Sequence, residues 1–198
     1  MVPAAYFASS FFLGSIPNAY LAGRLWKSID IRHHGSGNVG ATNVFRVLGR
    51  GPALVVFSLD FLKGALPVLL FSRFFPLAAD PEFLRFIAGL CAVFGHMFTP
   101  FLGFKGGKGI ASGAGVLCAS FPLLFLSALS VWITVFASLR IVSLSSLAAV
   151  LALFASSFFL RTQGNIRGVF LGVVLLVFWS HRANIGRLMR GEEQRFSK

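Results

Sequence analysis

The stretch from Pro52 to Phe75 reads PALVVFSLDFLKGALPVLLFSRFF, and Asp60 and Lys63 are its only charged residues before Arg73. Because an α-helix rises about 1.5 Å per residue, about 20 apolar residues cross a hydrocarbon core of about 30 Å. The stretch is therefore typical of a transmembrane helix. Ionisable groups inside a span either pair with one another or face a functional cavity. We interpret Asp60 and Lys63 as a structural ion pair, with a catalytic role as the alternative.

The rest of the chain repeats this apolar pattern. Of its 198 residues, 56% are hydrophobic and 12% are charged, and the mean hydropathy is +0.80, whereas soluble domains carry about 25% charged residues. Further apolar runs extend over about Pro3–Trp26, Phe83–Phe101, Phe121–Leu139, Ile141–Leu160 and Asn165–Ser180, with a shorter one at Ile110–Ser120. These runs predict an all-α integral membrane protein, a compact bundle of about seven transmembrane helices that forms a single polytopic domain over residues 1–198.

The distribution of basic residues predicts the orientation of these spans. With seven spans and the N-terminus outside, thirteen Lys and Arg residues lie inside and four outside, in agreement with the positive-inside rule. The two glycine-rich loops and the C-terminal tail are then cytoplasmic. The segment Ile110–Ser120 is short for a full crossing, and without it six spans would place the glycine-rich loops and the tail on opposite sides.

The net charge of +12 arises from 18 Lys and Arg against 6 Asp and Glu. In a membrane protein such an excess collects in cytoplasmic loops and meets anionic lipid, so we expect membrane lipid and no nucleic acid as a partner. Cys91 and Cys118 each lie in an apolar segment, and they predict neither a disulfide framework nor a metal site. The first run has no basic residue before Arg24 and exceeds the apolar core of a signal peptide, so we expect it to be retained as the first span.

The first glycine cluster reads GSGNVGATN from Gly35 to Asn43, and Arg46 follows one helical turn later. It matches the dinucleotide pattern G-x-G-x-x-G, but no buried strand precedes it, so we exclude that function. Glycines nevertheless allow successive N–H groups to form an anion nest, and Ser36 and Thr42 add hydroxyl groups. The cluster indicates a phosphate site, with a flexible polar loop as the alternative.

The second cluster runs from His96 to Gly109 and reads HMFTPFLGFKGGKG. It is not a nucleotide-binding P-loop, because Gly109 stands where Ser or Thr should follow the lysine. Lys105 and Lys108 flank a Gly-Gly pair, and a following helix would add its N-terminal dipole, an arrangement suited to phosphate. The alternative is a basic turn whose glycines serve tight packing.

A third polar cluster follows the last apolar run. His181 and Asn184 are three residues apart, so they share one face of a helix, and Glu193 lies in the tail beyond them. A single histidine at a membrane edge is more often an interfacial residue than a catalyst.

Together these clusters resemble the acyl-phosphate-dependent glycerol-3-phosphate acyltransferase family of bacteria, known as PlsY. The resemblance covers nearly the whole chain, and the segments that carry it are Gly14–Pro17, Gly35–Arg46, Asp60–Gly64, Gly95–Gly109 and His181–Arg187, with Gly191 and Glu193.

The resemblance implies transfer of a fatty acyl group from acyl phosphate to the 1-hydroxyl of glycerol 3-phosphate, which gives lysophosphatidic acid and phosphate. It also implies an inner-membrane protein whose site faces the cytoplasm and which needs no acyl-CoA, metal or other cofactor. The residues expected to be catalytic are Ser36, Arg46, Lys105, His181 and Asn184. Those expected to bind substrate are Gly37, Asn38, Gly40, Thr42, Asn43, His96, Gly106, Gly107, Lys108 and Gly109. Glu193, Asp60 and Lys63 are expected to be structural.

The chemistry of the donor agrees with these residues. Acyl phosphate is a mixed anhydride with phosphate as its leaving group, so a strongly activated protein nucleophile is not required. The H-x-x-x-x-D motif of acyl-CoA-dependent enzymes is missing after each of the four histidines. Ser36 is either an acylated nucleophile or a hydrogen-bond donor, and both remain open. The competing hypothesis is a small membrane transporter or channel for an organic phosphate.

Overall fold

The computed structural model describes residues 4–77, 80–160 and 162–196. The described residues form helices and connecting loops without a strand, so the predicted all-α class is confirmed. The chain divides into two compact units, Met1–Ser120 and Phe121–Lys198. Each unit is described by itself below.

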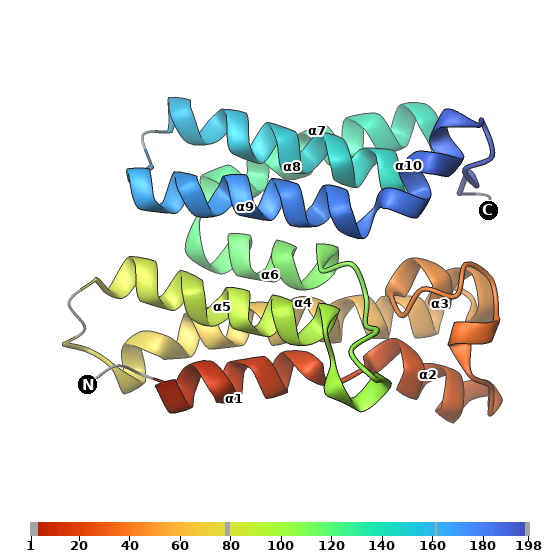
Figure 1. The fold of residues 1–198 in the computed structure, drawn as a ribbon, viewed down its shortest axis with the longest axis horizontal. Coiled ribbons are helices and arrows are strands. Elements are labelled where there is room, and N and C mark those ends of the chain that lie inside the picture. The colour runs from red at the N-terminus through yellow and green to blue at the C-terminus, as the bar shows by residue number, and fades with distance from the viewer. Residues whose placement is uncertain (1–3, 78–79, 161, 197–198) are drawn as a thin grey trace. The chain divides into compact units, whose positions relative to one another are not determined.

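The described residues of the first unit form six α-helices and two short 3-10 turns, and Figure 1 labels the α-helices. They are α1 (Ala4–Ser15), α2 (Asn18–Lys27), η1 (Ile31–His33), α3 (Ala41–Leu48), α4 (Arg50–Phe74), α5 (Pro81–Met97), η2 (Pro100–Leu102) and α6 (Ile110–Ser120). The second unit contains α7 (Pro122–Leu139), α8 (Val142–Phe159), α9 (Gly164–Ser180) and α10 (Arg182–Met189).

Proline and aspartate residues define where several of these helices begin. Asp80 precedes α5 and accepts a hydrogen bond from the backbone N–H of Phe83 at 3.1 Å, while Pro81 occupies the first helical position. A proline is tolerated there because its missing N–H would have no partner within the helix. Pro122 occupies the first position of α7 in the same way. At the other end of α7, Arg140 caps the helix in the left-handed conformation, with φ 58°.

Four helical segments among the described residues are long and apolar enough to cross a membrane: Arg50–Phe74, Pro81–Leu102, Pro122–Leu139 and Val142–Phe159. The bent pair α9 and α10, with 61° between its parts, makes a fifth if it counts as one span. Helix α6 has 11 residues and is therefore about 16 Å long, about half the hydrocarbon thickness. The expected crossing at Ile110–Ser120 thus corresponds to a short helix, and the count of seven spans stays a prediction.

The first apolar run, expected as one span from Pro3 to Trp26, forms two helices that are separated at Ile16 and Pro17. Proline has no N–H to donate and disfavours a helical residue before it, so the helix ends there. The carbonyls at the end of α1 receive side-chain donors from elsewhere in the unit. Thr99 donates to the Ser15 carbonyl at 2.7 Å, and Lys63 donates to the Ile16 carbonyl at 2.8 Å.

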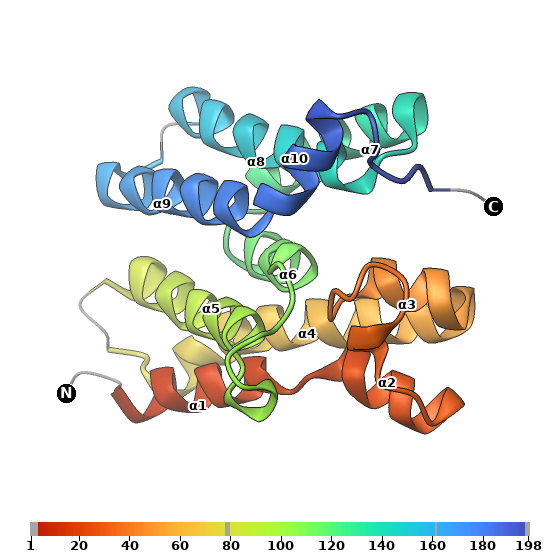
Figure 2. The same ribbon diagram turned by 45° about the vertical axis from the view of Figure 1, so that its right-hand side comes forward.

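Reciprocal glycines allow two pairs of helices in the first unit to touch backbone to backbone. A Cβ atom on Gly14 would lie 2.0 Å from the Ala92 carbonyl oxygen, and one on Gly95 would lie 2.0 Å from that of Phe11, so α1 and α5 pack at their closest approach. Gly64 and Gly115 do the same for α4 and α6, and both views show α6 against α4 and α5 (Figures 1 and 2). Small residues at such crossings are typical of membrane helices.

In the second unit, serines connect α7 to α8. Ser127 donates to the Ser156 hydroxyl at 2.9 Å, and the Trp132 indole donates to the Ser146 hydroxyl at 3.2 Å. Hydrogen bonds between apolar helices hold them together where lipid offers no polar partner.

Candidate functional site

The first glycine loop, between α2 and α3, is folded around the side chain of Asn43. Asn43 is buried, and its amide nitrogen donates to the carbonyls of Ile31 at 3.2 Å and His34 at 3.0 Å. Its amide oxygen accepts from the backbone N–H of Ser36 at 2.8 Å. Both hydrogens of the side-chain amide are therefore donated to carbonyls of the loop. Asn43, which we expected to bind substrate, stabilises the conformation of the loop.

Glycines are required where this loop closes on Asn43. Gly35 has φ +60°, and a Cβ atom there would come within 2.3 Å of the Asn43 amide oxygen. Gly37 has φ +71° and donates its N–H to the His34 carbonyl at 3.1 Å. Ser36 is therefore exposed at the tip of the loop, while its backbone N–H is hydrogen-bonded to the side chain of Asn43.

The predicted residues after this loop belong to α3. Gly40 precedes the helix, and its carbonyl accepts from the N–H groups of Asn43 and Val44. Thr42 and Arg46 are four residues apart and partly buried, so they lie on the same face of the helix. Asn38 lies beside Gly40, because a Cβ atom on Gly40 would come within 2.9 Å of the Asn38 amide nitrogen.

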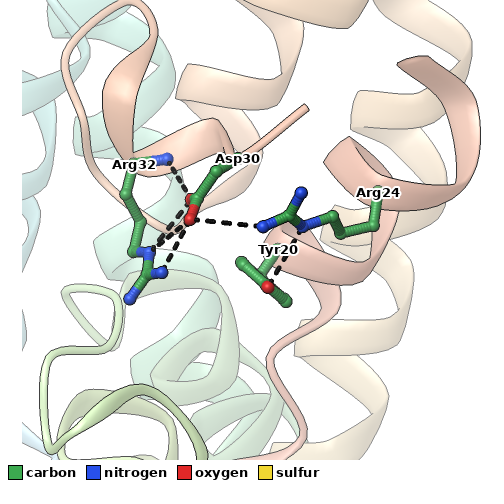
Figure 3. Close-up of polar contacts among 4 residues, drawn as sticks. All are labelled: Tyr20, Arg24, Asp30 and Arg32. Atoms are coloured by element: carbon green, nitrogen blue, oxygen red, sulfur yellow. Dashed lines mark hydrogen bonds and ion pairs between the residues drawn. The ribbon is translucent and has the colours of Figure 1, made fainter. Parts of the chain in front are cut away.

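An ion-pair cluster at the base of the same loop was missed by the sequence reasoning (Figure 3). Asp30 accepts from the Arg32 guanidinium at 2.6 Å and from its backbone N–H at 3.0 Å, and it lies 3.7 Å from the Arg24 guanidinium. Both guanidinium groups lie over the Tyr20 ring, at 5.2 and 5.3 Å from its centroid. The Arg32 hydrogen bond lowers the pKa of Asp30 well below its ordinary value, although partial burial opposes the shift. The available signal in the sequence was an acidic residue, Asp30, between the basic residues Lys27 and Arg32.

The second glycine loop turns back onto the end of α5. The N–H of Gly106 donates to the Met97 carbonyl at 3.0 Å, and that of Gly107 donates to the His96 carbonyl at 3.1 Å. We expected these two N–H groups to bind a phosphate. In this structure they donate to backbone carbonyls of α5 instead. The basic groups that flank them are the exposed Lys105 and the partly buried Lys108.

Gly107 is the point at which the two glycine loops meet. A Cβ atom on Gly107 would lie 2.1 Å from Nε2 of His96 and 2.8 Å from the Val39 carbonyl oxygen. Val39 belongs to the first loop and precedes Gly107 by 68 residues, so the two glycine clusters, far apart in the sequence, adjoin in space. Gly109, with φ +80°, then leads directly into α6.

A buried polar cluster lies beneath the second loop. Asp60 and Lys63 of α4 form an ion pair at 2.8 Å, as the sequence predicted. Asn18 donates to the same Asp60 oxygen at 2.9 Å, and Nδ1 of His96 lies 3.6 Å from it. Sequence reasoning missed Asn18 and Thr99. The available signal was Pro17, which ends a helix inside an apolar run and so leaves carbonyls that need donors.

The third cluster lies in the second unit and centres on Glu193. One carboxylate oxygen accepts from Asn184 at 2.6 Å and from Ser143 at 2.7 Å, and the other accepts from Arg187 at 2.6 Å. Burial raises the pKa of Glu193, but these hydrogen bonds outweigh it, so the pKa lies below its ordinary value. Glu193 thus joins α8 and α10 to the tail, and its expected structural role stays a prediction. Ser143 was not expected in this cluster.

The ring of His181 is oriented by the helix that precedes it. Its Nδ1 lies 2.8 Å from the Val177 carbonyl, and because a carbonyl only accepts, the proton is on Nδ1. In the neutral ring, Nε2 is then the acceptor nitrogen. His181 and Asn184 are both buried. His181 lies at the bend between α9 and α10, and Asn184 lies in the first turn of α10. The described residues contain no group of three His, Cys, Asp or Glu side chains that could hold a metal ion.

Comparison with known proteins connects these clusters to one family. A family model described as glycerol-3-phosphate acyltransferase matches residues 4–191. The glycerol-3-phosphate acyltransferase of Synechococcus sp. (strain CC9902) is 45% identical over 193 residues, which cover 96% of this chain and 94% of the relative. That of Aquifex aeolicus (strain VF5) is 42% identical over 189 residues, with 94% and 95% covered.

Comparison with solved structures leads to the same family as comparison with sequences. The crystal structure of PlsY (YgiH), an integral membrane glycerol 3-phosphate acyltransferase in its glycerol 3-phosphate form, matches with a TM-score of 0.90 at 39% identity, covering 98% of this chain and 95% of that chain. Its lysophosphatidic acid form matches with a TM-score of 0.87 at 38% identity. The predicted integral membrane class is thereby confirmed. From the family model, the relatives and the fold alike, the chain belongs to the glycerol-3-phosphate acyltransferase family.

Proposed function

We propose that this chain transfers a fatty acyl group from acyl phosphate to the 1-hydroxyl of glycerol 3-phosphate and releases lysophosphatidic acid and phosphate. The observation that carries the proposal is the match, over nearly the whole chain, to PlsY in a glycerol 3-phosphate form and a lysophosphatidic acid form. These two molecules are the acceptor and the product of the proposed reaction.

Acyl phosphate is the donor that the residues favour. In the reaction, the 1-hydroxyl oxygen attacks the acyl carbonyl carbon, the new ester bond forms and the bond to phosphate breaks. The leaving phosphate carries enough negative charge to accept the hydroxyl proton, so no strongly basic side chain is needed. Cationic groups that face the phosphates stabilise the charge that develops, and Arg46 and Lys105 have this role in our proposal. Acyl-CoA, a metal ion and an organic cofactor have no part in it.

In our proposal, some of the other site residues contact substrate and others hold their neighbours in place. Ser36, at the exposed tip of the first loop, contacts substrate either as a hydrogen-bond donor or as a nucleophile. His181 and Asn184 contribute to the reaction, and Glu193 holds Asn184 in place through a hydrogen bond of 2.6 Å.

We further propose that the protein lies in the bacterial cytoplasmic membrane as one polytopic domain with the site facing the cytoplasm. The excess of basic residues in the loops that carry the glycine clusters supports this orientation. The bacterial origin of the relatives supports the proposal of a bacterial membrane.

The test of the donor uses purified protein in detergent, without a membrane gradient. Radiolabelled glycerol 3-phosphate and palmitoyl phosphate should give labelled lysophosphatidic acid, and palmitoyl-CoA should not replace palmitoyl phosphate. Efficient use of the thioester would overturn the assignment of the donor, and no lipid product with either donor would overturn the proposed reaction.

A further inference from the structure

Asp60 is a buried carboxylate that the proposed reaction does not use. It lies in the middle of α4 with 1% of its surface exposed, and its neighbours Lys63 and His96 are exposed by 4% and 7%. Burying charges costs free energy unless they are paired and hydrogen-bonded, and apolar replacements of such pairs are often at least as stable. Stability alone therefore does not explain this cluster, and its contacts lead toward the glycine loops.

On one side, the cluster contacts the chain between α1 and α2, where the first apolar run is interrupted. Asp60 accepts from Asn18 at 2.9 Å, at the start of α2, and Lys63 donates to the Ile16 carbonyl at 2.8 Å, at the end of α1. The Ile16 carbonyl precedes Pro17, which has no N–H of its own. The Asp60 and Lys63 pair therefore fixes α1 and α2 to α4 at the position where the helix is interrupted.

The other side of the cluster reaches the second glycine loop through His96. Nδ1 of the ring lies 3.6 Å from the Asp60 carboxylate, and Nε2 lies so close to Gly107 that a Cβ atom there would be 2.1 Å away. The backbone carbonyl of His96 accepts the N–H of Gly107 at 3.1 Å. His96 thus contacts Gly107 with both its ring and its backbone, while Asp60 lies behind the ring.

We propose that Asp60, with Lys63, is a positioning residue of the acceptor site: through His96 it holds the loop that carries Lys105 and Lys108 against the first glycine loop. The proposal rests on the proposed function, because the loop is assigned to the phosphate of glycerol 3-phosphate. Asp60 does not touch substrate. Its effect should therefore appear in the affinity for glycerol 3-phosphate and in the mobility of the loop.

The test removes both charges together, because removal of one leaves the other buried and unpaired. The double variant Asp60→Leu/Lys63→Met keeps similar side-chain volumes. Relative to wild type, we expect its KM for glycerol 3-phosphate to rise about tenfold, the factor that corresponds to about 1.4 kcal/mol, while its KM for acyl phosphate is unchanged. His96→Leu, which retains the ion pair, should loosen the same loop.

A second readout follows the loop without using activity. Lys105 is an exposed trypsin site, and cleavage there requires the loop to open locally. In detergent, both variants should be cut after Lys105 about tenfold faster than wild type, as a loss of about 1.4 kcal/mol of anchoring predicts. Mass spectrometry of the fragments identifies the site of cleavage.

Tyr6→Phe is the matched control. It removes a hydrogen bond of 2.7 Å from α1 to the Pro67 carbonyl of α4, so it weakens the same pair of helices without a contact to the loop. It should lower the melting temperature and leave both KM values and the rate of cleavage unchanged. If the double variant behaves as this control does, the positioning role is overturned. If wild-type protein makes no lysophosphatidic acid, the proposed function fails, whereas unchanged cleavage after Lys105 overturns the inference whatever the activity.

Discussion

A single methyl group at Gly107 tests whether the second glycine loop belongs to the acceptor site. The added Cβ atom would lie 2.1 Å from Nε2 of His96, so the ring would have to retreat by about 1.3 Å to restore the ordinary contact of 3.4 Å. The same Cβ atom would lie 2.8 Å from the Val39 carbonyl oxygen, so the backbone of the first loop would also have to shift.

Overpacking of this kind costs about 1–3 kcal/mol, and a misplacement of about 1 Å in a positioned group can reduce rates by about a hundredfold. The phosphate of glycerol 3-phosphate is remote from the hydroxyl that is acylated, so contacts to it are made about equally in the ground and transition states. In Gly107→Ala, the KM for glycerol 3-phosphate should therefore rise by about tenfold or more, with a smaller fall in kcat. The KM for acyl phosphate should stay as in wild type.

The assay is steady-state kinetics in detergent with each substrate varied in turn, after gel filtration has shown that the variant is folded. Gly113→Ala in α6 is the control, because a Cβ atom on Gly113 meets nothing within 4 Å and alanine favours a helix over glycine. A folded Gly107→Ala protein with an unchanged KM for glycerol 3-phosphate would remove this loop from the binding site. A fall in kcat alone would assign Gly107 a purely structural role.

Three further predictions concern charge, topology and pH. Arg46→Lys should lose much of the activity, because a guanidinium holds a phosphate through two parallel hydrogen bonds and an ammonium does not; near-normal turnover would indicate a topogenic role. Single cysteines at Ser28 and at Ser197, which lies outside the described residues, should both resist an impermeant thiol reagent applied to intact cells that express protein without native cysteines. Labelling of only one would contradict the model of seven spans. Because the folded pKa of Glu193 lies below its ordinary value of 4.5, its ionised form stabilises the fold above that value, and this contribution is lost as the pH falls through the lowered pKa. Thermal unfolding as a function of pH should therefore show a steeper loss at acid pH for wild type than for Glu193→Gln, and parallel curves would contradict the linkage.

Local patterns predicted most of the long helices. The apolar runs predicted α4, α5, α7, α8 and α9 to within a few residues, because the length of a span follows directly from the hydrocarbon thickness. The division of the first run was missed, although Pro17 marked it, because hydropathy averaged over a window does not register the loss of one backbone donor.

The residue types of the site were also readable from the chain, since glycines, lysines and a following helix predict an anion site wherever they occur together. The role of each individual residue could not be predicted from the sequence. The sequence suggested that the amides of Gly106 and Gly107 face a ligand, but in the folded chain they donate to α5. Asn43 likewise holds its own loop, because a buried amide takes whichever backbone carbonyls the turn brings within reach.

The long-range contacts depended on the tertiary structure alone. Thr99 donates to a carbonyl 84 residues away, and Asn18 donates to Asp60 across 42 residues. No periodicity in the sequence encodes these pairings, because they form only when helices cross, and the crossings depend on glycines that allow backbones to touch. The amino-acid pattern thus determined that the chain is a helical membrane protein and predicted that its glycine-rich loops bind an anion. Packing determined that the two loops meet at Gly107, with a buried carboxylate behind them.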